Sequence, residues 1–169
     1  MRDAIVSSVQ SRRRPLAEEI LDDLHILVAQ YIRALVLLAI ATFVSYSIFL
    51  SATGVPYAIL LASIAGVLEL IPVVGPLTAA VVTLLVSGLS GYDHMLWIVI
   101  FLLVYRLFQD YVLSPFLLSS GVEIHPVVVL FGVLAGEQVA GIPGMFFSVP
   151  VIAALRIILV RMRRRKANA

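Results

Sequence analysis

Ionisable side chains inside apolar stretches are the first residues that could carry chemistry in this sequence. Arg106, Gln109 and Asp110 lie in the apolar stretch 95–113 at positions i, i+3 and i+4, which share one face of a helix. Charges are costly in hydrocarbon, and those present usually face a polar interior or mark an ion or substrate pathway. The three residues therefore predict a gate or a proton- or cation-linked site. The alternative is a self-neutralising structural ion pair near the membrane edge.

Two more acids stand before interruptions that are rich in glycine and proline. Glu69 precedes Ile-Pro-Val-Val-Gly-Pro at 71–76, and Glu137 precedes Gly-Ile-Pro-Gly at 141–144. Unwound backbone beside a carboxylate can coordinate a cation or hydrogen-bond a polyol. The alternative is a glutamate at the membrane interface that faces lipid headgroups. The candidate pathway also includes the residues that form the interruptions, whose more ordinary role is to break helices: Pro72, Gly75, Pro76, Gly141 and Gly144.

The balance of these embedded charges indicates what such a site would bind. Glu69, Asp110 and Glu137 are opposed by Arg106 alone. An acidic interior favours cations, protons or neutral hydroxylated solutes over anions. We also expect the two interruptions to lie at similar membrane depth and to approach each other around one polar cavity, because lipid offers freed backbone groups no hydrogen-bond partner.

The composition places these residues in a membrane protein. Hydrophobic residues make up 62% of the chain and charged residues 13%, whereas a soluble domain is about half apolar and about a quarter charged. Basic residues cluster from Arg2 to Arg33 and from Arg156 to Lys166, with Arg106 alone between them. By the positive-inside rule, both ends are predicted to be cytoplasmic, with an even number of crossings of the inner (plasma) membrane.

The apolar pattern predicts an all-α, multi-pass transmembrane protein with two helical hairpins broken by Gly and Pro. Residues 31–50 and 95–113 are long enough to span a bilayer. Each is followed by two shorter apolar pieces, which lie at 57–70, 77–89, 126–135 and 145–160. Each pair is predicted to form a re-entrant hairpin or a broken helix, with six complete spans as the alternative.

The same pattern divides the chain into three regions. These are a cytoplasmic amphipathic arm at 1–30, a transmembrane permease domain at 31–162 and a basic cytoplasmic tail at 163–169. Ser114-Pro115 is expected to end the second span, because proline disfavours helical geometry in the residue before it. Tyr31, Tyr92 and Trp97 are expected to be anchors at the membrane–water interface.

Other classes of function find little support. No phosphate-binding loop is present, so ATP is not the expected energy source. His25, His94 and His125 lack metal-ligand spacing, and the chain has no cysteine. We therefore expect no enzyme activity, no cofactor and no bound metal. The basic tail is interpreted as a topology signal and not as a nucleic-acid-binding segment.

Several short motifs then occur in a defined order along the chain. They are Gly54-Val55-Pro56-Tyr57-Ala58, Glu69 to Pro76, Leu113-Ser114-Pro115, His125 to Val129, Gly141 to Met145, and Val149-Pro150. In this order they resemble the autoinducer-2 exporter family, over about residues 16–162. Family members are about twice as long, so the chain resembles their C-terminal half. The resemblance implies export of a small signalling molecule or, in some members, sodium–proton exchange.

Together these features predict a secondary, gradient-driven transporter or exporter of a small solute such as an autoinducer. A sodium/proton antiporter is one alternative, and a non-transporting membrane subunit or a fragment of a longer permease is another. The expected partners are the lipid bilayer and a small solute or cation. Small-residue faces such as Gly132 and Gly136 favour helix packing and make a homo-oligomer the expected assembly.

Overall fold

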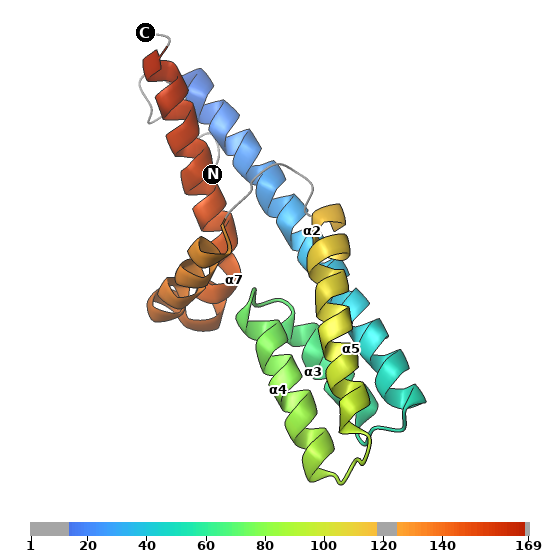
Figure 1. Cartoon of the computed structure of the whole chain (residues 1–169). Helices are drawn as coiled ribbons and strands as arrows, with labels where there is room; N and C mark the ends of the chain where they lie inside the picture. The colour runs from blue at the N-terminus through green and yellow to red at the C-terminus, as the bar shows by residue number, and fades with distance from the viewer. Residues whose placement is uncertain (1–13, 118–124, 168–169) are drawn as a thin grey trace.

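The computed structural model describes residues 14–117 and 125–167, and within these ranges the chain forms helices and turns without a strand (Figure 1). The helices, in chain order, are α2 (Arg14–Ala52), α3 (Ala58–Leu68), α4 (Val74–Leu89), α5 (Met95–Phe108), a π-helical turn η1 (Gln109–Leu113), α6 (Ser114–Leu117) and α7 (Pro126–Ala167). In the described part of the chain, three stretches are long and apolar enough to cross a membrane: His25–Ala52, Met95–Leu117 and Val127–Arg156. The prediction of an all-α membrane protein is confirmed.

Helix α2 joins the predicted arm and the first predicted span into one helix of 39 residues. No glycine or proline occurs between Pro15 and Gly54, so nothing in the sequence interrupts the helix. Its buried residues recur every three or four positions along one face, at Tyr31, Ala34, Leu35, Leu38, Thr42, Tyr46 and Leu50. This face packs on α3 and α7. The last part of α7 lies alongside the first half of α2 (Figure 1).

Helices α3 and α4 form a hairpin that is too short to cross a bilayer twice. They contain 11 and 16 residues, which correspond to roughly 17 and 24 Å of helix, against a hydrocarbon core of about 30 Å. Gly75 in the first turn of α4 lies directly against the carbonyl group of Leu68 at the end of α3. The hairpin closes at this point because glycine has no Cβ. Re-entrant packing, one of the two predicted arrangements, fits these lengths.

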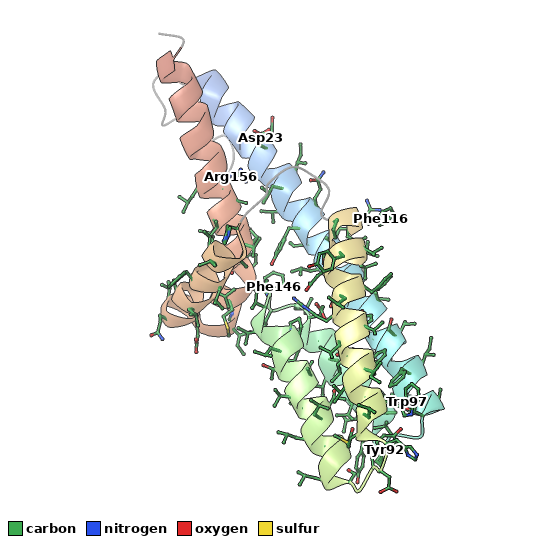
Figure 2. The ribbon with its side chains drawn as sticks, in the orientation of Figure 1. Asp23, Tyr92, Trp97, Phe116, Phe146 and Arg156 are labelled. Atoms are coloured by element: carbon green, nitrogen blue, oxygen red, sulfur yellow. The ribbon has the colours of Figure 1, made fainter. Side chains whose placement is uncertain are left out.

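The second span does not end at Ser114-Pro115 as predicted. The helix widens into the π-helical turn η1, in which Ser114 N–H donates to the carbonyl of Gln109, and it continues through α6. Proline lacks an N–H and crowds the carbonyl of the preceding turn. A π-turn adds one residue per turn and thereby accommodates Pro115. Phe116 on α6 projects outward, with 79% of its surface exposed (Figure 2).

Helix α7 bends back on itself and is not one straight span. The backbone leaves helical geometry at Ala140 (φ −143°, ψ 16°) and at Gly141 (φ 62°, ψ −140°). On either side of this bend Gly136 and Gly144 touch through their backbones, and a Cβ on either would overlap the carbonyl of the other. Val127–Arg156 therefore has the length of a span but is folded as a hairpin, with Gly136 and Gly144 as its packing contact.

Candidate functional site

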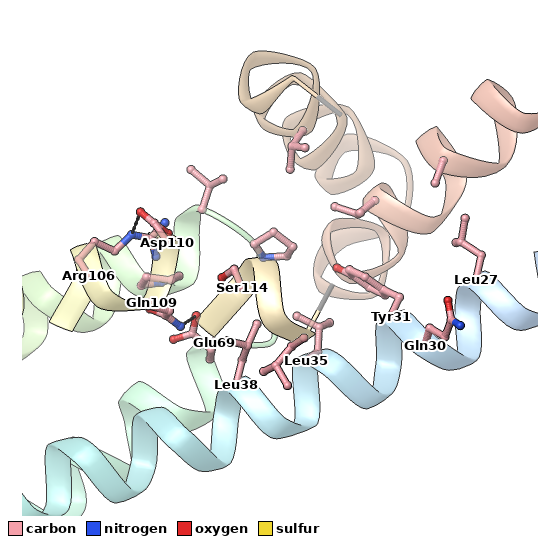
Figure 3. A pocket seen from close by; sticks show the side chains of 17 residues that line it. Leu27, Gln30, Tyr31, Leu35, Leu38, Glu69, Arg106, Gln109, Asp110 and Ser114 are labelled. Atoms are coloured by element: carbon pink, nitrogen blue, oxygen red, sulfur yellow. Dashed lines mark hydrogen bonds and ion pairs between the residues drawn. The ribbon is translucent and has the colours of Figure 1, made fainter. Parts of the chain in front are cut away.

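A cavity of about 310 Å³ opens where the α3–α4 break meets the middle of α2, the end of α5 and residues 129–153 of α7 (Figure 3). Its polar lining comes from the α3–α4 break, from the α5–η1–α6 segment and from Gln30 and Tyr31 of α2, whereas the other lining residues of α2 and those of α7 are apolar. The lining residues are Leu27, Gln30, Tyr31, Leu35, Leu38, Glu69, Pro72, Val73, Pro76, Arg106, Gln109, Asp110, Ser114, Leu117, Val129, Val149 and Ala153.

Glu69 is the buried acid of this cavity. It is the first residue after α3, and only 7% of its surface is exposed. The side-chain amide of Gln109 donates to Glu69 Oε1 at 2.6 Å, and the hydroxyl of Thr42 donates to Glu69 Oε2 at 3.0 Å. Both donors are themselves buried. Glu69 is therefore held from two other helical segments, by neutral side chains alone.

A second hydroxyl extends this network. Tyr105 Oη lies 2.9 Å from Thr42 Oγ1. A hydroxyl has a single proton, so when Thr42 donates to Glu69 it must accept from Tyr105. The ring of Tyr105 packs edge-on against Tyr46 and is stacked on Phe101, which fixes its position.

The charged pair lies at the rim of the cavity. Arg106 Nε contacts Asp110 Oδ2 at 2.9 Å, and these side chains keep 43% and 45% of their surfaces exposed. The two residues are one helical turn apart, whereas Gln109 between them points inward to Glu69 (Figure 3). The positive charge of the cavity is thus engaged by Asp110 and not by Glu69.

The backbone at the break is strained. Val73 adopts φ 67° and ψ −55°, and Val74 N–H donates to the carbonyl of Pro72 at 2.7 Å. This is the rare γ-turn with positive φ, and such geometry in a β-branched residue costs about 1–3 kcal/mol. The turn lets α3 end and α4 begin within five residues, Glu69 to Val73.

Comparison with known proteins shows the family to which this chain belongs. Residues 1–164 match the sequence profile of the AI-2E family transporters. The chain belongs to the AI-2E transporter family. It is 33% identical to "Putative transport protein YrrI" of Bacillus subtilis over 138 residues, which cover 82% of this chain and 39% of that protein. YueF of the same organism, similarly named, is 26% identical over 157 residues, 87% of this chain and 42% of the relative.

A third relative and the lengths of the relatives complete the comparison. "Putative transport protein" of Methanothermobacter thermautotrophicus is 37% identical over 97 residues, 54% of this chain and 27% of that protein. The chain thus spans about two fifths of the length of the curated Bacillus relatives. No solved structure matches the chain.

The structure brings together only some of the site residues predicted for this AI-2E family member. Those that line the cavity are Glu69, Pro72, Pro76, Arg106, Gln109 and Asp110. Gly75 does not line the cavity and lies against the backbone of Leu68. Glu137 is exposed, and neither it nor Gly141 nor Gly144 lines the cavity. The expectation that both interruptions share one cavity is therefore not met, because α7 reaches this cavity through Val129, Val149 and Ala153.

Several side chains at the site were not predicted as site residues, among them Thr42, Tyr105 and Tyr31. Thr42 and Tyr105 complete the network around Glu69. Tyr31, expected to be an anchor at the membrane–water interface, is 7% exposed, lines the cavity and donates to the carbonyl of Phe146 at 3.4 Å. Its ring also packs edge-on against that of Phe146. Thr42 could have been found from the sequence as a hydroxyl residue in the middle of an apolar span, because a buried hydroxyl needs a hydrogen-bond partner.

The arrangement suits hydrogen-bonded binding more than metal binding. Among the described residues, no group of three His, Cys, Asp or Glu side chains lies close enough together to hold a metal ion. Gln109 presents its amino group to Glu69, so it supplies no oxygen ligand there. The cavity offers the carboxyl group of Glu69, the amides of Gln30 and Gln109, the hydroxyls of Tyr31 and Ser114, the Arg106–Asp110 pair at its rim, and an apolar wall.

Proposed function

We propose that this chain forms the solute-binding part of a secondary, gradient-driven transporter for a small neutral or cationic solute of the autoinducer type. One observation carries the proposal: Glu69 is buried at a helix break and opens onto a cavity within the membrane-spanning part. Broken helices that enclose a cavity are the usual location of a transporter's binding site. An ionisable residue held there is costly and points to function.

The charges of the cavity support a neutral or cationic solute. Arg106 is the cationic side chain of the lining, and its guanidinium is already paired with Asp110. An anionic solute would have to displace Asp110 while lying near the carboxyl group of Glu69. A polyol can instead hydrogen-bond to the carboxyl, amide and hydroxyl groups around the cavity, with its carbon skeleton against Leu35 and Leu38.

The cysteine-free sequence allows a direct test of solute binding. Val73 lines the cavity, whereas Leu77, one turn further along α4, does not and is 67% exposed. In the protein expressed from its native gene, autoinducer-2 should slow maleimide labelling of Val73→Cys severalfold and leave labelling of Leu77→Cys unchanged. Equal labelling of Val73→Cys with and without autoinducer-2 would contradict binding of this solute in the cavity.

The proposal includes a topology in the inner membrane with both ends of the chain in the cytoplasm. The start of α2 and the end of α7 lie at the same end of the molecule (Figure 1). Basic residues cluster at both ends of the sequence, which favours retention on the cytoplasmic side. Reporter fusions at residue 14 and at residue 167 should both report the cytoplasm. A periplasmic signal from either fusion would refute this orientation.

A further inference from the structure

We propose that Glu69 carries the coupling proton of transport. Tyr105, acting through Thr42, holds the carboxyl group of Glu69 in place in both its charged and its protonated state. This inference rests on the proposed transport function and names its coupling ion. It follows from the hydrogen-bond geometry around the two oxygens of Glu69.

The two carboxyl oxygens have different partners. Oε1 faces the amino group of Gln109, which can only donate. Oε2 faces the hydroxyl of Thr42, which can donate or accept. A proton can therefore be added to Oε2 without loss of a hydrogen bond, but not to Oε1, where it would meet an N–H.

Protonation of Oε2 reverses the hydroxyl chain. In the charged state, Tyr105 donates to Thr42 and Thr42 donates to Glu69. When a proton from water in the cavity binds Oε2, Glu69 donates to Thr42, whose own proton turns to the oxygen of Tyr105. The tyrosine hydroxyl rotates its proton away from Thr42. The carboxyl group goes from −1 to 0 by gaining this one proton, and Glu69 keeps its position.

The surroundings favour a proton over a metal ion as the charge that Glu69 takes up. The charged or titratable groups around it are Tyr105 and Arg106 of α5, Asp110 of η1, and Tyr31 and Tyr46 of α2. Arg106 is paired with Asp110, and the tyrosines are neutral. A buried carboxylate without a cationic partner is costly, and addition of a proton relieves that cost without additional oxygen ligands.

The test separates proton coupling from solute movement. Liposomes containing the protein are assayed for autoinducer-2 accumulation driven by a pH gradient and for autoinducer-2 counterflow, which needs no net proton movement. Glu69→Gln, which keeps the shape without a titratable proton, should reduce gradient-driven accumulation at least tenfold and preserve counterflow. Thr42→Val and Tyr105→Phe should each move the pH midpoint of accumulation upward by about one unit. Thr42→Val removes the hydroxyl that donates to the charged carboxylate, and Tyr105→Phe removes the hydroxyl that orients Thr42.

Two controls guard against a merely structural effect. Thr42→Ser retains the hydroxyl and should keep the wild-type pH midpoint. Tyr111→Phe removes a hydroxyl from a tyrosine with 78% of its surface exposed and should also leave the midpoint unchanged.

The remaining outcomes overturn the inference in distinguishable ways. If Glu69→Gln still accumulates solute with the pH gradient, or loses counterflow as well, Glu69 is not the proton carrier but transport by the wild type stands. Wild-type accumulation that follows a sodium gradient at constant pH would likewise exclude the proton while leaving transport intact. Absence of counterflow in the wild type would refute the transport of autoinducer-2 and this inference together.

Discussion

Replacement of Gly75 by alanine is expected to prevent α3 and α4 from closing into their hairpin. A Cβ at this position would overlap the carbonyl group of Leu68, which is backbone and cannot rotate away. Overpacking of a well-packed interior costs about 1–3 kcal/mol, even where side chains can adjust. We therefore expect a loss at or above the top of that range. It would appear as a large fall in the thermal unfolding midpoint in detergent or as failure to accumulate in the membrane.

Gly88 in the same helix provides the matched control. Its added Cβ would lie 3.7 Å from the terminal methyl group of Met95, an ordinary contact. Alanine in a helix is favoured over glycine by about 0.5–1 kcal/mol, so Gly88→Ala should be neutral or slightly stabilising. If Gly75→Ala unfolds at the same temperature as Gly88→Ala, the close approach of α3 and α4 is incorrect.

Much of the secondary structure was accessible from the sequence because its causes are local. The predicted spans 31–50 and 95–113 lie within helical stretches that are long and apolar enough to cross a membrane. The backbone also leaves helical geometry at or beside the sequence interruptions, between α3 and α4 and at Ala140–Gly141. Glycine and proline act on their immediate neighbours, so their positions could be read directly.

The partners of the acids could not be read in this way because tertiary contacts decide them. Glu69 meets Gln109 across 40 residues and Thr42 across 27. Glu137 occupies a comparable place before its interruption, yet it is exposed. Each glutamate stands a few residues before a Gly/Pro interruption, so this pattern did not predict which of the two would be buried. The difference arises because α2 and α5 converge on the first hairpin, whereas the Gly136–Gly144 contact closes the second on itself.

The π-turn explains why the spacing of Arg106, Gln109 and Asp110 was only partly informative. Their i, i+3, i+4 pattern placed all three on one face, and all three line the cavity. The structure nevertheless gives them different environments, since Gln109 is 2% exposed whereas the charged pair remains at the rim. Widening of the helix around Pro115, which a sequence pattern of 3.6 residues per turn does not anticipate, begins at Gln109.

A tryptophan in place of Val129 is expected to close the cavity and stop transport. Val129 is a half-buried residue near the start of α7 that lines the cavity. The indole would occupy space that a solute needs, without touching the network around Glu69. We expect the rate of autoinducer-2 counterflow in liposomes to fall at least tenfold. The variant should still be folded, because the tryptophan fills existing space and does not displace packed side chains.

The neighbouring Val128 supplies a control of identical chemistry. It precedes Val129 on the same helix, does not line the cavity and is 46% exposed. Tryptophan is well tolerated on surfaces that face the membrane interface, so Val128→Trp should transport at close to the wild-type rate. The two variants carry the same added bulk at adjacent positions. A difference in their transport rates therefore cannot be explained by the size of the tryptophan alone. If Val129→Trp transports as fast as Val128→Trp, the solute does not pass through this cavity, and the proposed site must be abandoned.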